Sequence, residues 1–494
     1  MEDISLIIIN EKDNVAVALH DIKAGEEHNG IKFLNDIPFG HKVAIKNISK
    51  DENIIKYGFP IGYAKNDIKM GEHVHTHNLH TNLNDIIDYE YNPIDIKNNN
   101  EVESDIFFDG YKRADGKVGT RNEVWIIPTV GCVNNTAKTL ENMASKKFGD
   151  RCDGIFAYTH NMGCSQTGND QIITQKLLSG IIKNPNAGGV LIVSLGCENN
   201  NLEIFKPFLE GIDKNKIRFL ITQDVEDEYK EGMKYLDELT EYASTFKREK
   251  VPIKYLTIGF KCGGSDAFSG ITANVVCGKL NNIFIKNGGS SILTETPEMF
   301  GAETILMSRA INKKVFDNMV NLINGYKNYF KKYGETIYEN PSPGNKKGGI
   351  SSLEEKSLGC VQKGGTSPIV DILDYGEYIS KSGLNILKGS GNDQVSCTNL
   401  TASGANIILF TTGRGTPFGS IVPTLKISSN SNLYQKKNNW IDFNAGKVLE
   451  NIPVDDIVNE LFELVINIAS GKIKTKNEIN GYKEISIFRD GIIL

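Results

Sequence analysis

Four of the eight cysteines each follow a short apolar segment that is typical of a buried strand. Each has a glycine beside it, which lets a ligand approach the backbone closely. If the strands form a parallel sheet, these cysteines lie at its carboxyl edge, where such sheets bind ligands. One cysteine alone would be interpreted as a small residue buried at a tight turn. Together they predict one site that contains Cys132, Cys164, Cys197 and Cys262.

Two further cysteines lie in segments rich in glycine, serine, threonine and asparagine, Cys360 in 357–366 and Cys397 in 389–399. Such segments present backbone N–H groups and short polar side chains that suit a carboxylate or a polyol, although ordinary surface turns have the same composition. Arg414 stands between two glycines shortly after an apolar segment. Its planar guanidinium is suited to bind a carboxylate through two hydrogen bonds.

Four of the eight histidines fall within residues 73–80. If this segment is extended, His73, His75 and His77 share one face, with successive imidazoles about 6.5 to 7 Å apart. Neighbouring pairs would then be able to bind one iron, zinc or copper ion. The alternative is a surface strand with incidental histidines. The concentration of histidines favours metal binding or acid–base chemistry, but it does not indicate which of the two.

The elements that must position these residues differ along the chain. Residues 5–83 show short apolar segments and turns without a helical period, which predicts a small β-rich domain. Beyond an Asn-rich, acidic stretch, strand, Gly-rich turn and helix repeat, which predicts a mainly parallel sheet covered by helices. The polar segment 340–349 precedes a last part whose strand at 406–411 either joins that sheet or belongs to a third unit. We therefore predict an α/β protein with a β domain at 1–89, a linker at 90–106, an α/β domain at 107–339 and a C-terminal α/β segment at 340–494.

Composition excludes several classes of function. The chain has 494 residues, which is enough for two or three domains. Its formal charge of -6 comes from well-mixed charges with no long basic run, so nucleic acid is not an expected partner. No apolar stretch approaches the roughly 20 residues of a membrane span, and no signal peptide is evident, so we expect a cytoplasmic protein without a membrane partner. The sequence contains no GxxxxGK[ST] loop and no GxGxxG turn after a predicted strand, so nucleotide binding of these kinds is not expected.

Six separated motifs in the same order resemble the altronate/galactarate dehydratase family. They are 110–122 (GYKRADGKVGTRN), 163–166 (GCSQ), 195–199 (LGCEN), 261–270 (KCGGSDAFSG), 340–350 (NPSPGNKKGGI) and 412–417 (TGRGTP). The first domain, which ends in the His-rich segment, resembles the SAF (β-clip) module of these enzymes. Within the family, the length and the His-rich segment fit altronate enzymes better than galactarate enzymes.

This resemblance implies a hydro-lyase that requires a divalent metal, Fe2+ or Mn2+, and that acts on a sugar acid as a homodimer. For altronate, loss of the C2 proton and the C3 hydroxyl gives 2-dehydro-3-deoxy-gluconate. The reaction needs an electrophile at the carboxylate, a base at C2 and an acid for the departing hydroxide. Alternatives are galactarate dehydration or a related reaction, and a non-catalytic sugar-acid-binding protein, because SAF modules also occur in non-catalytic settings.

Specific residues follow from that implication as hypotheses. We expect His160 or Lys261 to be the base that removes the C2 proton. Asp266 or Glu198 is expected to act as a metal ligand or as the acid. The substrate is expected to contact Arg414, with Arg113 or Arg121, and Asn399. The expected metal ligands are His75, His77, Glu198 and the six cysteines Cys132, Cys164, Cys197, Cys262, Cys360 and Cys397. Because six cysteines exceed what one ion needs, an iron–sulfur cluster is the alternative cofactor.

Overall fold

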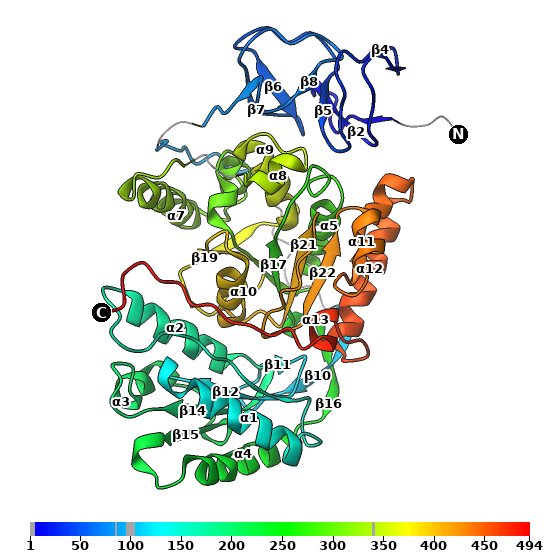
Figure 1. Ribbon diagram of the computed structural model, residues 1–494. Helices are drawn as coiled ribbons and strands as arrows, with labels where there is room; N and C mark the ends of the chain where they lie inside the picture. Colours follow the sequence, from blue (N-terminus) through cyan, green and yellow to red (C-terminus); the bar gives the residue numbers. More distant parts are fainter. Residues whose placement is uncertain (1–4, 84–85, 95–103, 338–340) are drawn as a thin grey trace.

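The chain is organised in three parts, which lie one above another in Figure 1. The computed structural model describes residues 5–83, 86–94, 104–337 and 341–494. Short β-strands form the first part, a four-stranded parallel sheet forms the second and a seven-stranded parallel sheet forms the third. These parts confirm the predicted class, a small β domain followed by α/β domains. Within the described ranges, no helix is long and apolar enough to cross a membrane.

The first part is built from small antiparallel sheets. One sheet has the order β1-β2-β5-β8, with β1 at Leu6–Ile7, β2 at Val15–Ala18, β5 at Lys42–Ala44 and β8 at His73–Val74. A second has the order β6-β7-β9, with β6 at Asn53–Lys56, β7 at Phe59–Ala64 and β9 at Leu79–His80. A hairpin pairs β3 (Glu27–His28) with β4 (Ile31–Lys32).

The four-stranded sheet has the order β13-β12-β14-β15, all parallel. Its strands are β12 (Glu123–Pro128), β13 (Ile155–Ala157), β14 (Ala187–Ser194) and β15 (Ile217–Ile221). Alternate residues of β14 pack on opposite faces, one against α2 (Asp170–Lys183) and the other against α1 (Asn134–Phe148) and α4 (Glu228–Ser244). Burial on both faces explains why these strands are continuously apolar in sequence.

A small antiparallel sheet closes this second part. It pairs β10 (Phe107–Lys112) with β11 (Val118–Gly119) on one side and with β16 (Arg248–Pro252) on the other. The chain therefore enters and leaves the second part along neighbouring strands. Of the predicted linker 90–106, residues 95–103 lie outside the described residues. Tyr91 before them donates a hydrogen bond to the carbonyl of Ala310, 3.0 Å away.

The seven-stranded sheet has the order β19-β20-β18-β17-β21-β22-β23, all parallel. Two strands precede residue 340, β17 (Thr257–Cys262) and β18 (Ser290–Leu293). Five follow it: β19 (Ile369–Leu373), β20 (Leu384–Leu387), β21 (Ile407–Thr412), β22 (Thr424–Ser428) and β23 (Phe443–Asn444). The C-terminal segment thus completes a sheet that begins before it, and the boundary predicted at 339 falls within that unit.

Helices cover both faces of this sheet (Figure 1). Leu409 of β21 packs in the cluster that includes α5 (Ala273–Lys286) and α12 (Val454–Ala469). Its neighbours Ile408 and Phe410 pack in the cluster that includes α10 (Asp393–Ala402). The helices α7 (Lys313–Lys332), α8 (Pro343–Lys347) and α9 (Leu353–Cys360) follow β18 and precede β19 in sequence. In Figure 1, α8 and α9 lie between this sheet and the first domain.

Candidate active site

The cysteines that follow strands form two groups on two different sheets. Cys132, Cys164 and Cys197 follow β12, β13 and β14 of the four-stranded sheet, whereas Cys262 ends β17 of the seven-stranded sheet. The four cysteines therefore do not share one sheet edge as the prediction assumed, because these strands belong to two separate sheets. One common site stays a prediction.

A buried centre forms around Cys262. Its Sγ lies 3.4 Å from the Sγ of Cys360 and 3.2 Å from Oε2 of Glu298, which is 3.0 Å from Cys360 Sγ. Cys262 is the last residue of β17, Glu298 follows β18, and Cys360 ends α9. In the part of the chain that the structure describes, this is the one group of at least three His, Cys, Asp or Glu residues whose ligand atoms all lie within 4.8 Å of one another.

Three lysines and three carboxylates surround this centre with balanced charge. Lys261 contacts Glu295, and its Nζ lies 3.2 Å from Oδ1 of Asp393. Lys363 pairs with Glu295 at 2.8 Å, and Lys356 pairs with Glu298 at 2.8 Å. The side chains of Lys261 and Glu295 are fully buried, whereas that of Asp393 is 35% exposed. Asp393 is therefore the member of this network that solvent or substrate can reach.

The network fixes the protonation of its members. Burial acts to lower the pKa of Lys261, but attraction to Glu295 and Asp393 outweighs it and the pKa is raised. Burial acts to raise the pKa of Glu298, but Lys356 and Lys261 lower it overall. For Asp393, burial raises the pKa more than Lys261 lowers it. Lys261 is thus held protonated and Glu298 ionised, while Asp393 has an increased proton affinity.

The first domain covers this edge of the seven-stranded sheet (Figure 1). Lys42 and Lys56 reach across to Glu355 of α9, at 2.8 and 2.7 Å, with all three side chains buried. Nearby, a cavity of about 10 Å³ includes Tyr57 of the first domain and Cys360 of the centre in its lining. That volume suffices for about one water molecule, so a sugar acid must approach from a more open side.

Histidines of the first domain lie in the same interface. The Nδ1 atom of His41 is 3.0 Å from Nε2 of His73, and Nδ1 of His75 is 2.8 Å from Oγ of Ser351. The strand β8 ends at Val74, so His75 and His77 are not on an extended face as predicted. The turn after β8 places the ring centroids of His73 and His77 5.4 Å apart. The ring of His41, the residue before β5, lies 5.2 Å from that of His73.

Comparison with known proteins agrees with this architecture. Residues 253–493 match the family model "D-galactarate/Altronate dehydratase, C-terminal", and residues 110–244 match "D-galactarate dehydratase/Altronate hydrolase, second domain". Residues 4–82 match the "Altronate/galactarate dehydratase SAF domain". The altronate dehydratase of Bacillus subtilis is 48% identical, with 99% of this chain and 100% of that protein covered. The chain belongs to the altronate/galactarate dehydratase family.

Other relatives differ in similarity. The altronate dehydratase of Escherichia coli is 45% identical, with 99% of both chains covered. The galactarate dehydratase (L-threo-forming) of Escherichia coli is 31% identical, with 98% of this chain and 96% of that protein covered. As a member of the family, the chain is a sugar-acid dehydratase, that is, a hydro-lyase.

Two predicted residues lie in loops at the carboxyl edge of the dehydratase's large sheet. Asp266 follows β17 and is buried, with acceptor contacts to Ser429 Oγ at 2.8 Å and Asn430 Nδ2 at 3.1 Å. Arg414 follows β21 and is held by one hydrogen bond of 3.3 Å to the carbonyl of Gly344. Asp266 orients loops, whereas the guanidinium of Arg414 retains free donors for a substrate carboxylate.

The contacts of His160 do not favour its expected role as the dehydratase's C2 base. Its Nε2 lies 2.8 Å from the carbonyl of Pro128, and its Nδ1 accepts from the N–H of Met162 at 3.1 Å. Burial lowers its pKa to about 4. Both ring nitrogens are therefore engaged with backbone.

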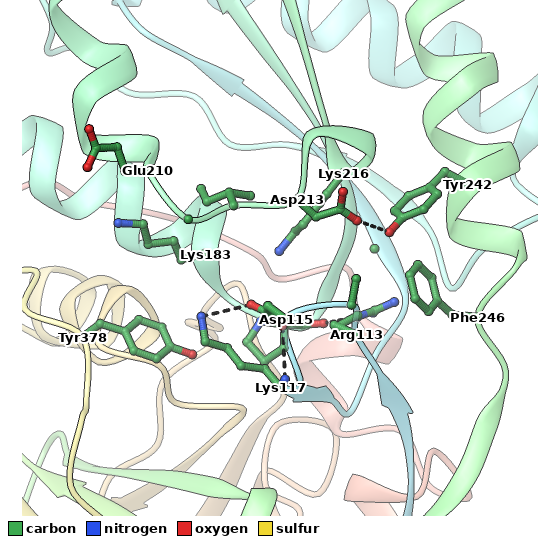
Figure 2. A pocket seen from close by; sticks show the side chains of 15 residues that line it. Arg113, Asp115, Lys117, Lys183, Glu210, Asp213, Lys216, Tyr242, Phe246 and Tyr378 are labelled. Carbon is green, nitrogen blue, oxygen red and sulfur yellow. Dashed lines mark hydrogen bonds and ion pairs between the residues drawn. The ribbon is translucent and has the colours of Figure 1, made fainter.

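Three predicted substrate contacts are likewise bonded elsewhere in the dehydratase. Asn399 donates to the carbonyl of Lys388 and accepts from the N–H of Gly376. Arg121 pairs with Glu478 at 2.6 Å in a buried site. Figure 2 shows Arg113 in the lining of a separate cavity, which second-domain residues form together with Tyr378 of the third part. The volume of this cavity is about 240 Å³. Their role as substrate contacts stays a prediction that these contacts do not support.

The last predicted ligand, Cys397, packs with Ile408 and Phe410 in the apolar cluster under α10. Burial raises its pKa well above the ordinary value. Sequence analysis missed Glu295, Glu298 and Asp393. A signal existed for the first two, because both follow the apolar strand at 291–294 as the cysteines follow theirs.

Proposed function

We propose that this dehydratase converts altronate to 2-dehydro-3-deoxy-gluconate and water at the carboxyl edge of the seven-stranded sheet. The observation that carries the location is the convergence of Cys262, Cys360 and Glu298 beside Lys261. The higher identity to altronate dehydratases, 45–48% against 31% for the galactarate enzyme, supports altronate as the substrate.

We propose Cys262, Cys360 and Glu298 as ligands of a divalent metal. Two thiols and a carboxylate suit Fe2+, and the alternative is Mn2+, a chemically harder cation that prefers oxygen ligands. The positive charges of the three lysines equal the negative charges of the three carboxylates. A divalent cation that displaces the protons of two thiols leaves this net charge unchanged. When bound, such an ion supplies Lewis-acid polarisation of a substrate oxygen.

The chain's own residues supply the remaining chemistry in this proposal. Arg414 binds the substrate carboxylate, and Asp393 accepts the C2 proton, since it combines partial exposure with a raised pKa. Protonated Lys261 lies buried behind Asp393, and its positive charge favours, without contact, the negative charge that develops on the substrate when the C2–H bond breaks. The C3–O bond then breaks, and the leaving hydroxide takes up the proton held by Asp393 and departs as water, which restores the ionised carboxylate. The enol gains a proton at C3 from solvent and loses its C2 hydroxyl proton, which gives the 2-keto acid. Lys261 thus acts as a buried cation that positions Asp393, instead of as the base.

The substrate assignment is tested by supplying altronate, galactarate and sulfolactate to anaerobic enzyme with fresh Fe2+ and following formation of a carbonyl product. Altronate is expected to react with the highest kcat/KM. A preference for galactarate would contradict the choice within the family. No product from any of the three would favour a sugar-acid-binding protein over an enzyme.

Replacing Asp393 with asparagine is expected to lower kcat by about 10² to 10⁴, the usual contribution of a general base, with a smaller change in KM. Asp374→Asn is the matched control, because Asp374 also pairs with a lysine but lies outside the buried centre. Its Oδ1 is 3.0 Å from Nζ of Lys388. Steady-state kinetics of both variants would measure the difference. Equal kcat values for Asp393→Asn and the wild type would rule out Asp393 as the base.

A further inference from the structure

Three cysteines of the second domain share one edge without belonging to the buried centre. Cys132 lies in the 3-10 helix at Gly131–Val133 after β12, Cys164 lies between β13 and α2, and Cys197 follows β14. The three strands are direct neighbours in the sheet order β13-β12-β14. Parallel strands place their carboxyl ends at one edge, so the three cysteines lie at the same edge of this sheet.

Hydrogen bonds join the three loops into one surface. The N–H of Gly131 donates to the carbonyl of Met162 at 3.1 Å, and the N–H of Asn200 donates to the carbonyl of Gly163 at 2.9 Å. Cys164 Sγ itself lies 3.2 Å from Oδ1 of Asn199. The loops of Cys132 and Cys197 are therefore each tied to the loop of Cys164.

Glu198 supports this surface from below. Its carboxylate accepts hydrogen bonds from the hydroxyls of Thr129 and Ser194, and from the N–H of Gly196 at 2.7 Å. The N–H of Leu195 donates to the same carboxylate at 3.2 Å, so Oε1 alone accepts three hydrogen bonds. Glu198 thus anchors the loop of Cys197, and these contacts do not favour its predicted role as a ligand.

Two of the three thiols are exposed, those of Cys132 and Cys197, although cysteine is among the most buried residue types. Cys164 is half-buried, as is Cys152 of the same domain, and both pack against the same apolar cluster. Cys152 differs in place, because it precedes β13 at the opposite edge and its thiol donates to the carbonyl of Gly154 at 3.4 Å. Packing in the core therefore does not explain the exposed Cys132 and Cys197.

The spacing of the thiols indicates what they would bind. Neighbouring strands are about 4.8 Å apart, so three strands spread their ligands over roughly twice that width. A single tetrahedral ion with metal–sulfur bonds of about 2.3 Å needs sulfurs within about 4 Å of each other. Among the described residues, these three thiols do not form a group within 4.8 Å. A polynuclear centre accepts the wider spacing.

We propose that Cys132, Cys164 and Cys197 bind an iron–sulfur cluster at this edge. Each thiol loses its proton to solvent and ligates one iron. Because a four-iron cluster has one more iron than these three thiolates, one iron faces the solvent-accessible side without a cysteine ligand. The amide of Gln223 donates toward Cys197 Sγ at 3.5 Å, a contact of the kind that tunes such clusters. This site is separate from the buried centre and does not depend on the proposed altronate reaction.

The full chain, purified anaerobically and reconstituted with ferrous and ferric iron and sulfide, tests the proposal. Acid-labile sulfide, bound iron and visible charge-transfer absorption are measured for the wild type and for Cys132→Ser, Cys164→Ser and Cys197→Ser. We expect the wild type to hold acid-labile sulfide, with iron in excess of sulfide by the one ion of the buried centre. Each variant is expected to lose most of the sulfide and the matching amount of iron. The controls Cys152→Ser and Cys262→Ser are expected to retain the sulfide.

Three results would overturn the proposal. The first is a wild-type protein without acid-labile sulfide, including one that binds zinc alone. The second is full sulfide retention in all three variants, and the third is equal loss in Cys152→Ser. Circular dichroism of every variant checks that the fold is retained, and sulfide retention in Cys262→Ser separates this site from the catalytic metal.

Discussion

Replacing Glu298 with glutamine is expected to abolish metal binding at the proposed centre and to lower turnover by at least about 10³-fold, since an oriented Lewis acid contributes several kcal/mol to such a reaction. Glu298 contacts both Cys262 and Cys360. The amide keeps the size of the side chain but removes the negative charge that attracts a cation. Metal content and kcat of the purified variant are the measurements.

Glu303→Gln is the matched control for this change. Glu303 is also a buried carboxylate of the C-terminal domain that pairs with a lysine, Lys327, at 3.2 Å. Its variant loses a comparable ion pair, yet we expect it to keep the metal. Equal metal content in Glu298→Gln and the wild type would show that the ion is bound elsewhere.

The second large effect is expected at the interface between the first domain and α9. Glu355→Gln removes the shared counter-charge of Lys42 and Lys56, which are both buried. Leaving buried charges without their partner costs about 3 to 5 kcal/mol. We therefore expect Glu355→Gln to lower the melting temperature of the full chain and to expose the first domain to proteolysis. Asp36→Asn, which breaks the exposed pair with Lys23, is expected to change neither.

The same carboxylate predicts a pH dependence. Burial acts to raise the pKa of Glu355, but Lys42 and Lys56 lower it to about 2. Because the folded pKa lies below the unfolded value, the stabilisation is complete above about pH 5 and is lost as the pH falls toward 2. The wild type should lose about 3 kcal/mol more than Glu355→Gln over this range. Parallel calorimetric profiles for the two proteins would contradict the assignment.

The fold could be predicted from sequence where local pattern decides the structure. The sequence pattern indicates strands at the apolar segments 190–195 and 217–222 and a helix at 454–469, and these are β14, β15 and α12. Strand order depends on packing between segments far apart in sequence. For that reason, the sequence did not show that β17 pairs with β21, nor that the early cysteines belong to a different sheet.

The sequence predicted cysteine ligands for the candidate site, but it did not identify all of the residues that form the site. Cys262, which follows an apolar segment, and Cys360, which lies in a Gly-rich segment, were expected as ligands through the family resemblance, and both lie in the buried centre. Their partner Glu298 and the accessible Asp393 come from other loops, which only the folded sheet brings together. The same limit explains why His41 was missed, because it lies 32 residues before His73 in sequence and contacts it only through the pairing of β5 with β8.

The most direct test of the central claim uses altronate labelled with deuterium at C2. Incubated with anaerobic, Fe2+-loaded enzyme, it should yield 2-dehydro-3-deoxy-gluconate that has lost the C2 deuterium, with a primary isotope effect where proton removal limits the rate. Altronate that binds the enzyme but is recovered intact, with its deuterium in place, would contradict the account.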